Sequence, residues 1–480
     1  MSITLVLAVF ASCGKKEIAP KSEDEAEEEE SAENLLRLAY SKNDSLDPYE
    51  METELNYQIS SLVFDGLFKL DKSYKPQPCI AQGGIVAESG ITVTLNDVSF
   101  SDGSKVTATD IISSFNKAKE SDIYSPRLDN IESASASSST MVLFKLSSPD
   151  PYALACLDFP IVKFDRGEDE LPIGSGRYLY AKSYDNLYLV VNVNKTGFNP
   201  LMKTIALEPV HESESVESSL VIGGKSFSYN NLSSGEFSRI DALSYEVVQN
   251  NLVFLGFNED SEFFSDPLVR KGVSTSLDRD AITTSAFQYH AVPTALPFNP
   301  SWYALEAKIS ELKFSEEDAK TYLKESDVEP ESGEVVLLCN RENEFKYQTA
   351  VQVKSMLENV GFFVRLKDYN EEDYVNELKY GTYDLFIGEI KLSADMNLRN
   401  LYDIAAPYDE DVQGTSLSRY IELLKGECEI MDYINSFNED FPFIPLCFRD
   451  GIASFTKSMQ VKEGFNDVDV FYDIESWSIK

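Results

Sequence analysis

The sequence predicts an α/β protein with more than one domain, and three observations lead to this prediction. The chain has 480 residues, whereas single hydrophobic cores stop growing at about 250–300 residues. Hydrophobic residues make up 43% of the chain and aromatic residues 12%, so sizeable cores can form and a wholly disordered chain is excluded. Strand and helix patterns alternate between residues 330 and 390, which is typical of a β-α-β unit with a partly parallel sheet.

The first half of the chain alternates short apolar runs with turn residues and two helical patterns. Apolar residues at helical spacing predict a helix from Glu54, and Thr107 or Thr109 is a suitable N-cap for a second helix. Turn residues separate the apolar runs from one another. The runs predict strands at 35–40, at 90–95 paired with 98–100, at 141–146 and from 174.

The second half begins with a predicted strand at Leu252–Phe257. Pro267 follows it, and proline is favourable in the first turn of a helix. Further along the chain, Gly361 can end a helix that starts near Tyr347. Strands are predicted on both sides of that helix, at 335–338, 362–366 and 383–387.

Charge and residue usage exclude several classes of function. The chain has 42 basic and 81 acidic residues, a net charge of −39. Such a surface repels phosphate backbones, so we expect no nucleic-acid partner. There are only two histidines, and the six cysteines show no ligand spacing, so we expect neither a metal site nor a cofactor. Gly174–Gly176 lacks the spacing of a nucleophile elbow, and no catalytic set is found, so we predict that the protein is not an enzyme.

The N-terminus resembles a bacterial lipoprotein leader. Residues 3–11 form an apolar run that is too short to span a bilayer but suits a signal peptide. Small residues then lead to Cys13, which would become the acylated N-terminus; the alternative is an N-terminal strand with a buried cysteine. Residues 14–34 are acidic and almost without apolar side chains, which predicts a flexible tether.

Several motifs occur in the same order as in the family 5 extracellular solute-binding proteins, the peptide receptors of ATP-binding-cassette importers. No single motif is specific, but together they extend over residues 35–460. The chain therefore resembles this family. The motifs are Ser45–Pro48, Val63–Phe68 ("YEGL"), Ile91–Gly103 ("LRKGVKFHDGTP"), Val106–Ile111 ("LTAEDV"), Ile173–Tyr178 ("GTGPY"), Leu268–Ile282 ("VRQALSYAIDREAI") and Asp318–Lys320 ("PEKAKALL").

The resemblance implies a two-lobed α/β fold, class II in connectivity, with an extra subdomain in lobe I. Residues 1–13 would be the signal peptide and 14–34 the tether. Lobe I would comprise residues 35–250, with the subdomain at about 55–165, and would be completed by residues 451–480. Lobe II would comprise residues 251–450, and the two chain crossings near 249–251 and 449–451 would form a hinge.

The resemblance also implies ligand contacts. Peptide-binding relatives carry a "W-x-x-D-x-x-D-P" segment whose aspartate pairs with the peptide α-amino group, and Asp395 falls on the second aspartate. The alternative is a solvated loop residue. Glu389 stands at the tryptophan position and Met396 at the proline position. Glu389 would contact a cationic side chain or face solvent, and Trp302 would contact ligand or pack in the core.

These observations together predict a monomeric, lipid-anchored receptor on the extracytoplasmic side of the cell membrane. It would bind a short peptide, close about its hinge and deliver the peptide to membrane permease subunits of an ABC importer. Two alternatives remain open. One is a binding protein for a non-peptide solute, and the other is a diverged sensor or adhesin lipoprotein without a transport role.

Overall fold

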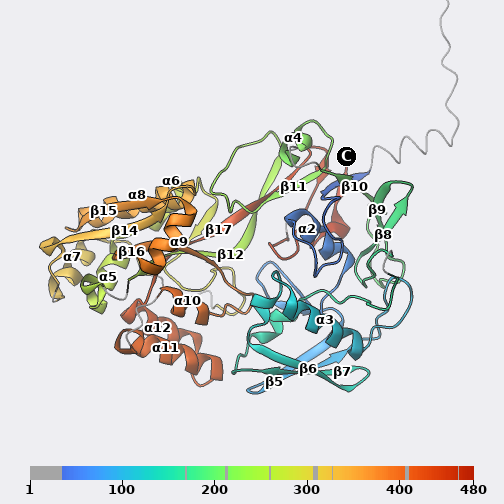
Figure 1. The fold of residues 1–480 in the computed structure, drawn as a ribbon, viewed down its shortest axis with the longest axis horizontal. Coiled ribbons are helices and arrows are strands. Elements are labelled where there is room, and N and C mark those ends of the chain that lie inside the picture. The colour runs from blue at the N-terminus through green and yellow to red at the C-terminus, as the bar shows by residue number, and fades with distance from the viewer. Residues whose placement is uncertain are drawn as a thin grey trace, which may run out of the picture. The chain divides into compact units, whose positions relative to one another are not determined.

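The computed structural model describes residues 35–167, 170–210, 215–258, 261–305, 312–326, 328–405, 410–462 and 464–480. Within them, Leu36–Lys480 form one compact unit (Figure 1). The predicted leader with Cys13 and the predicted tether lie outside the described residues.

A seven-stranded mixed sheet contains the predicted β-α-β unit. Strand β14 (Glu334–Asn340) runs parallel to β15 (Phe363–Tyr369), and α8 (Glu344–Asn359) connects them. Gly361 follows α8 at φ 108°, a conformation that favours glycine. The β-α-β prediction is therefore confirmed. The other strands are β11 (Phe227–Asn230), β17 (Ile444–Phe455), β12 (Leu243–Phe257), β16 (Leu385–Lys391) and β13 (Ala291–Pro293), and the sheet order is β11-β17-β12-β16-β14-β15 with β13 paired to β17.

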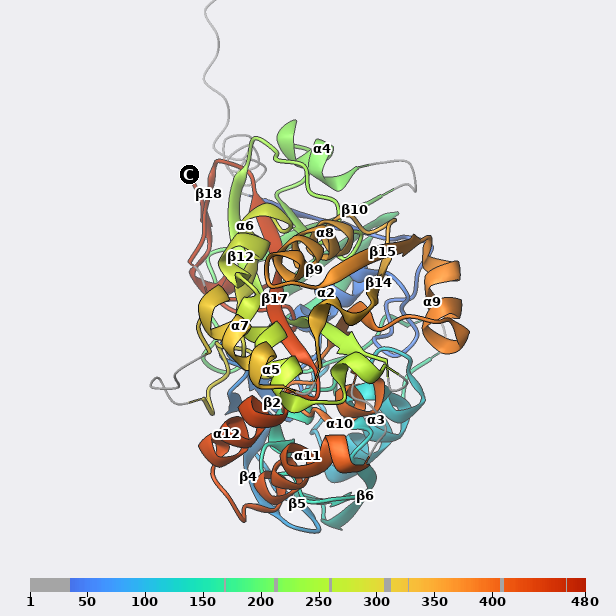
Figure 2. The same cartoon turned by 90° about the vertical axis from the view of Figure 1, so that its left-hand side faces the viewer.

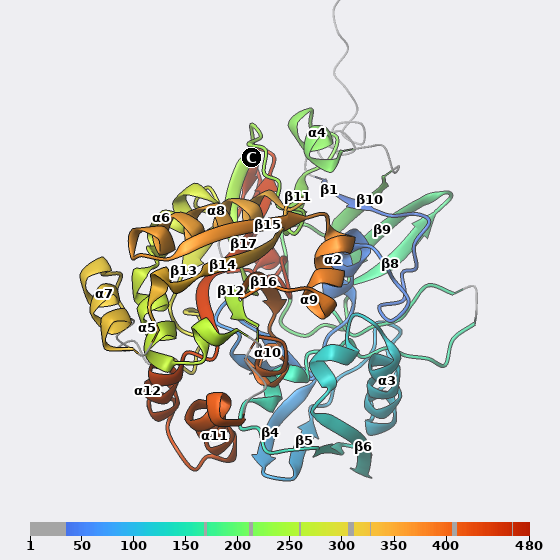
Figure 3. The same cartoon turned by 60° about the vertical axis from the view of Figure 1, so that its left-hand side comes forward.

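Helices cover this sheet and share a hydrophobic core with it (Figure 3). Pro267 occupies the first turn of its helix, as predicted, and the Asp266 side chain caps that turn by accepting a hydrogen bond from the Leu268 amide. The helices of this part are α5 (Pro267–Ser276), α6 (Arg279–Ser285), α7 (Glu316–Glu325), α9 (Glu371–Tyr380), α10 (Arg399–Ala405), α11 (Glu410–Lys425) and α12 (Ile430–Asp440).

A second sheet has the order β1-β10-β9-β8 and a core of its own. Its first strand pairs in parallel with β10, and the C-terminal residues Phe471 and Trp477 are buried in the same core. The elements are β1 (Leu36–Tyr40), α2 (Glu54–Val63), β8 (Tyr178–Ser183), β9 (Asn186–Val191), β10 (Thr204–Pro209), α4 (Val216–Val221) and the terminal pair β18 (Met459–Gln460) and β19 (Ser478–Ile479).

A third sheet, β4-β5-β7-β6, packs with α3 (Ala108–Glu120) around a separate core. Thr107, one of the two residues predicted as the N-cap, caps α3 in a capping box with Asp110. The predicted strand at 98–100 is wrong, because that segment makes only an isolated bridge between Ser99 and Lys105. The hairpin partner is β4 instead. The remaining elements are β2 (Phe68–Leu70), β3 (Pro76–Pro78), β4 (Ala81–Ala87), β5 (Gly90–Leu95), β6 (Ile131–Ser138) and β7 (Met141–Leu146).

The long strands β12 and β17 connect the first two cores. Their antiparallel pairing has a register shift between Val247 and Asn251. Val247 belongs to the core of the second sheet, and Leu252 belongs to the core of the seven-stranded sheet. The irregular residues therefore lie where the two strands pass from one core to the other. The lobe boundaries and the hinge themselves remain predictions.

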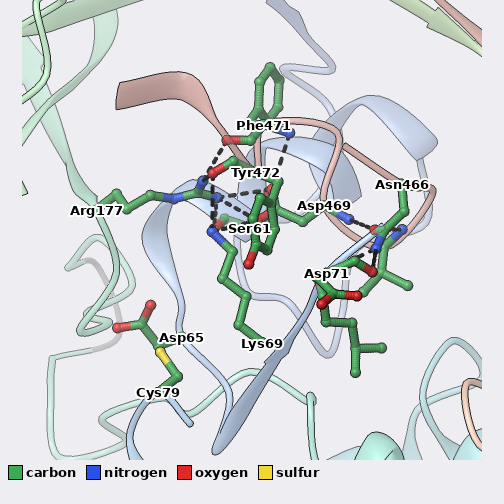
Figure 4. A network of polar contacts seen from close by, with 12 residues as sticks. Ser61, Asp65, Lys69, Asp71, Cys79, Arg177, Asn466, Asp469, Phe471 and Tyr472 are labelled. Atoms are coloured by element: carbon green, nitrogen blue, oxygen red, sulfur yellow. Dashed lines mark hydrogen bonds and ion pairs between the residues drawn. The ribbon is translucent and has the colours of Figure 1, made fainter. Parts of the chain in front are cut away.

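A buried polar network fixes the C-terminal segment (Figure 4). Arg177 Nη2 lies 2.9 Å from both carboxylate oxygens of Asp469, and Lys69 Nζ lies 3.0 Å from Asp469 Oδ2. Arg177 also donates to the carbonyl oxygens of Phe471 and Tyr472. Because these residues come from three distant parts of the chain, the network ties the C-terminus to the residues around α2 and β8.

Candidate ligand-binding cavity

A cavity of about 520 Å³ lies where three parts of the chain meet. This volume is within the range of about 300–1,000 Å³ that is usual for small-ligand sites. The first wall comes from residues that precede β6 and residues that follow β7. The second comes from the end of β16 and the residues after it, and the third comes from the C-terminal segment. Lining residues from these parts include Arg127, Asn130, Cys156, Asp395, Arg399 and Asp467.

The loop after β16 holds Asp395 in the cavity wall. Asp395 Oδ1 accepts hydrogen bonds from the Ser393 hydroxyl and from the Asn397 amide, the latter at 3.1 Å. The residue is 5% exposed. Met396 adopts φ 57°, which proline cannot adopt because its ring fixes φ near −65°. The loop therefore follows a backbone path that a proline at this position would not allow.

A second carboxyl group, that of Asp150, lies close enough to Asp395 for the charge of Asp395 to act on it, but Asp150 is not among the residues that line the cavity. Asp150 Oδ1 accepts from the Tyr152 amide at 2.8 Å, and this turn precedes the short helix η2 (Ala153–Cys156). Burial, followed by the charge of Asp395, raises the pKa of Asp150 well above its usual value. Sequence reasoning missed Asp150, because no local motif brings it together with a residue 245 positions later (395 − 150).

Glu389 lies on β16 and is outside the cavity lining. Its Oε1 lies 2.7 Å from Arg449 Nη2, and its Oε2 lies 3.2 Å from Lys346 Nζ. Burial alone would raise the pKa of Glu389, but the charges of Arg449 and Lys346 hold it below the usual value. The protein thus already supplies cations to this carboxylate, and a contact with ligand stays a prediction.

Trp302 is 2% exposed and packs edge-on against Tyr152, with 4.7 Å between the ring centroids. The ring centroid of Phe298 lies 5.1 Å from that of Trp302. Trp302 therefore packs in the core, which is the alternative that the sequence analysis gave to a ligand contact. It is not among the residues that line the cavity, and a contact with ligand stays a prediction.

Some charged groups in the cavity wall form ion pairs with other protein groups, and others do not. Lys391 Nζ lies 2.7 Å from Asp467, and Arg127 lies 2.8 Å from Asp158. Arg399 and Asp129 line the cavity, and neither forms an ion pair within the described part of the chain. The described residues also contain no group of three His, Cys, Asp or Glu side chains that could hold a metal ion. The wall therefore offers both signs of charge to a polar organic ligand.

Comparison with known proteins places the chain in a family. Residues 75–405 match the family model described as "Bacterial extracellular solute-binding proteins, family 5 Middle". The chain belongs to this family. This family 5 protein is 21% identical over 426 residues to the oligopeptide-binding protein AppA of Bacillus subtilis, covering 80% of the chain and 78% of AppA.

Solved structures of similar fold include two that differ in ligand. The periplasmic murein tripeptide binding protein MppA, in an unliganded open form, matches with a TM-score of 0.72 and 17% identity over 93% of this chain and 99% of MppA. NikA from Brucella suis in complex with Fe(III)-EDTA matches with a TM-score of 0.67 and 15% identity over 92% of this chain and 100% of NikA. The fold is accordingly the two-lobed α/β fold of periplasmic binding proteins, as predicted. Within the described residues no helix is both long and apolar enough to span a bilayer.

Proposed function

We propose that this family 5 protein is a receptor that binds short peptides outside the cytoplasm and delivers them to an ABC permease. The observation that carries the proposal is the placement of Asp395, which is 5% exposed, in the cavity wall. Acidic groups held at low exposure suit an ammonium group, which presents three hydrogen-bond donors. The relatives named as oligopeptide- and tripeptide-binding proteins support a peptide as the source of that ammonium group.

In this proposal Asp395 pairs with the peptide α-amino group. Removing one partner of a buried, hydrogen-bonded charge pair costs about 2–5 kcal/mol, which corresponds to a loss of roughly 30- to 5,000-fold in affinity. Calorimetry on Asp395→Ala with a peptide that binds the parent protein should show a loss in this range. Acetylating the peptide amine should weaken binding to the parent by a similar factor, and should weaken binding to the variant little further.

Asp129→Ala is the matched control, because Asp129 lines the same cavity, is exposed and carries the same charge. It should bind the peptide within about twofold of the parent, since exposed charges contribute little. An Asp395→Ala variant that binds as tightly as this control would contradict the amine contact.

We also propose that the receptor closes about β12 and β17, with residues 251–450 moving against residues 35–250 and 451–480. The register shift between Val247 and Asn251 supports this position for the hinge, because an interrupted ladder bends more easily than a regular one. Small-angle scattering should give a smaller radius of gyration with peptide than without. An identical profile at saturating peptide would contradict closure.

A lipid anchor at Cys13 is the remaining part of the proposal. Each buried CH₂ of an acyl chain contributes about 0.8 kcal/mol, so a cysteine with two or three chains would hold the protein at the membrane. Cys13→Ser should move the protein from the membrane fraction to the soluble fraction of disrupted cells. A variant that stays in the membrane fraction as fully as the parent would contradict lipidation.

A non-peptide ligand is the second candidate function, and the similarity to NikA in complex with Fe(III)-EDTA favours it. A metal chelate of this kind presents carboxylate groups, for which Arg399 in the cavity wall is a suitable partner. Asp395→Ala would then leave binding unchanged or strengthen it, whereas Arg399→Ala would weaken it. The two candidates therefore predict opposite results for Asp395.

A further inference from the structure

Arg399 is the cation of the cavity wall that has no ion-pair partner. Three cationic side chains from the described part of the chain line the cavity, and two of them are paired with a carboxylate. Lys391 Nζ lies 2.7 Å from Asp467 Oδ2. Arg127 Nη1 lies 2.8 Å from Asp158 Oδ2. The half-buried guanidinium of Arg399 forms neither a hydrogen bond nor an ion pair with any residue that the structure describes, so it is available to a ligand.

Arg399 begins α10, four residues (399 − 395) after Asp395. Its backbone amide donates to Asn397 Oδ1 at 3.0 Å, and the Met396 amide donates to the Ser393 carbonyl oxygen at 2.9 Å. These turns shorten the segment, and even a fully extended chain of four residues spans at most about 14 Å. A peptide of three residues spans up to about 10 Å by the same measure. When its amine lies at Asp395, the other end of such a peptide is therefore within reach of the Arg399 side chain.

The guanidinium group indicates which part of the ligand Arg399 would bind. Its planar fork of N–H donors matches the two oxygen atoms of a carboxylate. Asp150 does not already fill this role, because no hydrogen bond joins the two side chains, and burial and then Asp395 raise the pKa of Asp150 well above its usual value. A ligand that brought only an ammonium group would pair with Asp395 and enclose Arg399 without an anion, which is unfavourable. A ligand that carries both charges would satisfy both residues.

We propose that Arg399 is a specificity-determining residue, which binds a carboxylate of the ligand while Asp395 binds the ligand amine. This inference rests on the proposed function and adds a requirement to it, namely that the peptide carries a carboxylate close to its amine. Two sources can supply this carboxylate. One is the free C-terminus of a peptide of two or three residues, and the other is an acidic side chain at the second or third residue.

Calorimetry on the parent protein with tri-alanine, tri-alanine amide and Ala-Glu-Ala amide tests the requirement. At least one of the two peptides with a carboxylate should bind roughly 10- to 100-fold more tightly than tri-alanine amide, which is the range for a hydrogen bond to a charged group. A preference for tri-alanine assigns Arg399 to the C-terminus, and a preference for Ala-Glu-Ala amide assigns it to an acidic side chain. A parent that binds the three peptides equally overturns the inference, and this comparison requires no variant to fold.

Variants of Arg399 test whether this residue carries the preference. Arg399→Gln should bind all three peptides equally, at the affinity that the parent has for tri-alanine amide. Arg399→Lys should keep part of the preference, because the charge remains while the planar fork is lost. A preference that survives unchanged in Arg399→Gln overturns the assignment.

Lys391→Met is the matched control, because Lys391 lines the same cavity with the same charge but is already paired with Asp467. Whatever its absolute affinity, this variant should keep the ratio between the carboxylate-bearing peptide and the amide that the parent shows. A ratio that is lost in Lys391→Met and kept in Arg399→Gln would overturn the inference in favour of Lys391.

The outcomes separate this inference from the proposed function. If the parent shows no preference for a carboxylate but Asp395→Ala loses tri-alanine binding, only the role of Arg399 is overturned and the amine contact is kept. If Asp395→Ala binds tri-alanine as tightly as the parent does, the proposed function fails, and the inference that rests on it fails with it.

Discussion

The buried network around Asp469 allows the stability of the protein to be predicted with a stated magnitude. Arg177 and Lys69 contact this carboxylate at 2.9 and 3.0 Å, and Ser61 Oγ lies 3.0 Å from Oδ1 (Figure 4). Burial would raise the pKa of Asp469, but the two cations hold it at about 2, against 3.8 for a free aspartate. At 1.36 kcal/mol per pKa unit, the ionised form contributes about 2 kcal/mol of stability at neutral pH.

Asp469→Asn should cost more than this, because it leaves the buried Arg177 and the partly buried Lys69 without the carboxylate that pairs with both. Breaking a buried pair typically costs about 3–5 kcal/mol. In the parent, the depressed pKa means that this stability is present above about pH 4 and is lost as pH falls toward pH 2. The variant should lack that acid-dependent loss.

Tryptophan fluorescence during guanidinium unfolding is a suitable assay, because Trp302 and Trp477 lie in different cores. In a Trp302→Phe background, Trp477 reports on the C-terminal segment alone. Asp241→Asn is the control, since Asp241 pairs with Lys457 at 2.6 Å while 79% of its side chain is exposed. If Asp469→Asn lowers the Trp477 transition no further than this control, the reasoning about the network is wrong.

Two further predictions concern the hinge strand and a glycine contact. Burial and the charge of Glu246 raise the pKa of Asp450 to about 7, although His290 and Arg449 oppose this. The folded protein therefore binds this proton more tightly than the unfolded chain, and stability falls as pH rises from about 4 to 7. Asp450→Asn should remove that fall, and urea-unfolding midpoints of parent and variant at pH 5 and pH 8 would show it. A variant whose midpoint falls between these pH values as much as that of the parent would refute the prediction. Gly176→Ala would place its Cβ 2.5 Å from the Val63 carbonyl group and should lower Tm by several degrees. Gly83→Ala is the control, since its Cβ meets nothing within 4 Å.

Figure 2 shows α11 and α12 near β4 and β5, and an arrangement of this kind was not predictable from local patterns. Residues 424–426 at the end of α11 share a pocket of about 300 Å³ with residues 86–88. Strand β4, Ala81–Ala87, reads AQGGIVA, and its two glycines hide the alternation that would indicate a strand. The β-α-β unit was predictable because apolar runs, a helical pattern and a terminating glycine lie within one short segment.

The residues of the candidate site also differ in whether a local sequence pattern could indicate them. The resemblance singled out Asp395, which the structure places in the cavity wall. Glu389 was chosen by position in a motif, but its partners Arg449 and Lys346 are 60 and 43 residues away (449 − 389 and 389 − 346), so its ion pairs depend on tertiary structure. Asp150 has no motif at all. Its proximity to Asp395 follows from the tertiary structure alone, and it does not line the cavity.

Native mass spectrometry of the purified protein tests the central claim most directly. The account predicts that the chain carries one short peptide, or takes up one from a tripeptide mixture, and that N-acetylated tripeptides do not compete for it. Loss of the peptide from Asp395→Ala but not from Asp129→Ala would place the peptide in the cavity. A chain that binds acetylated and free tripeptides equally, or that carries a metal chelate and excludes peptides, would contradict the account.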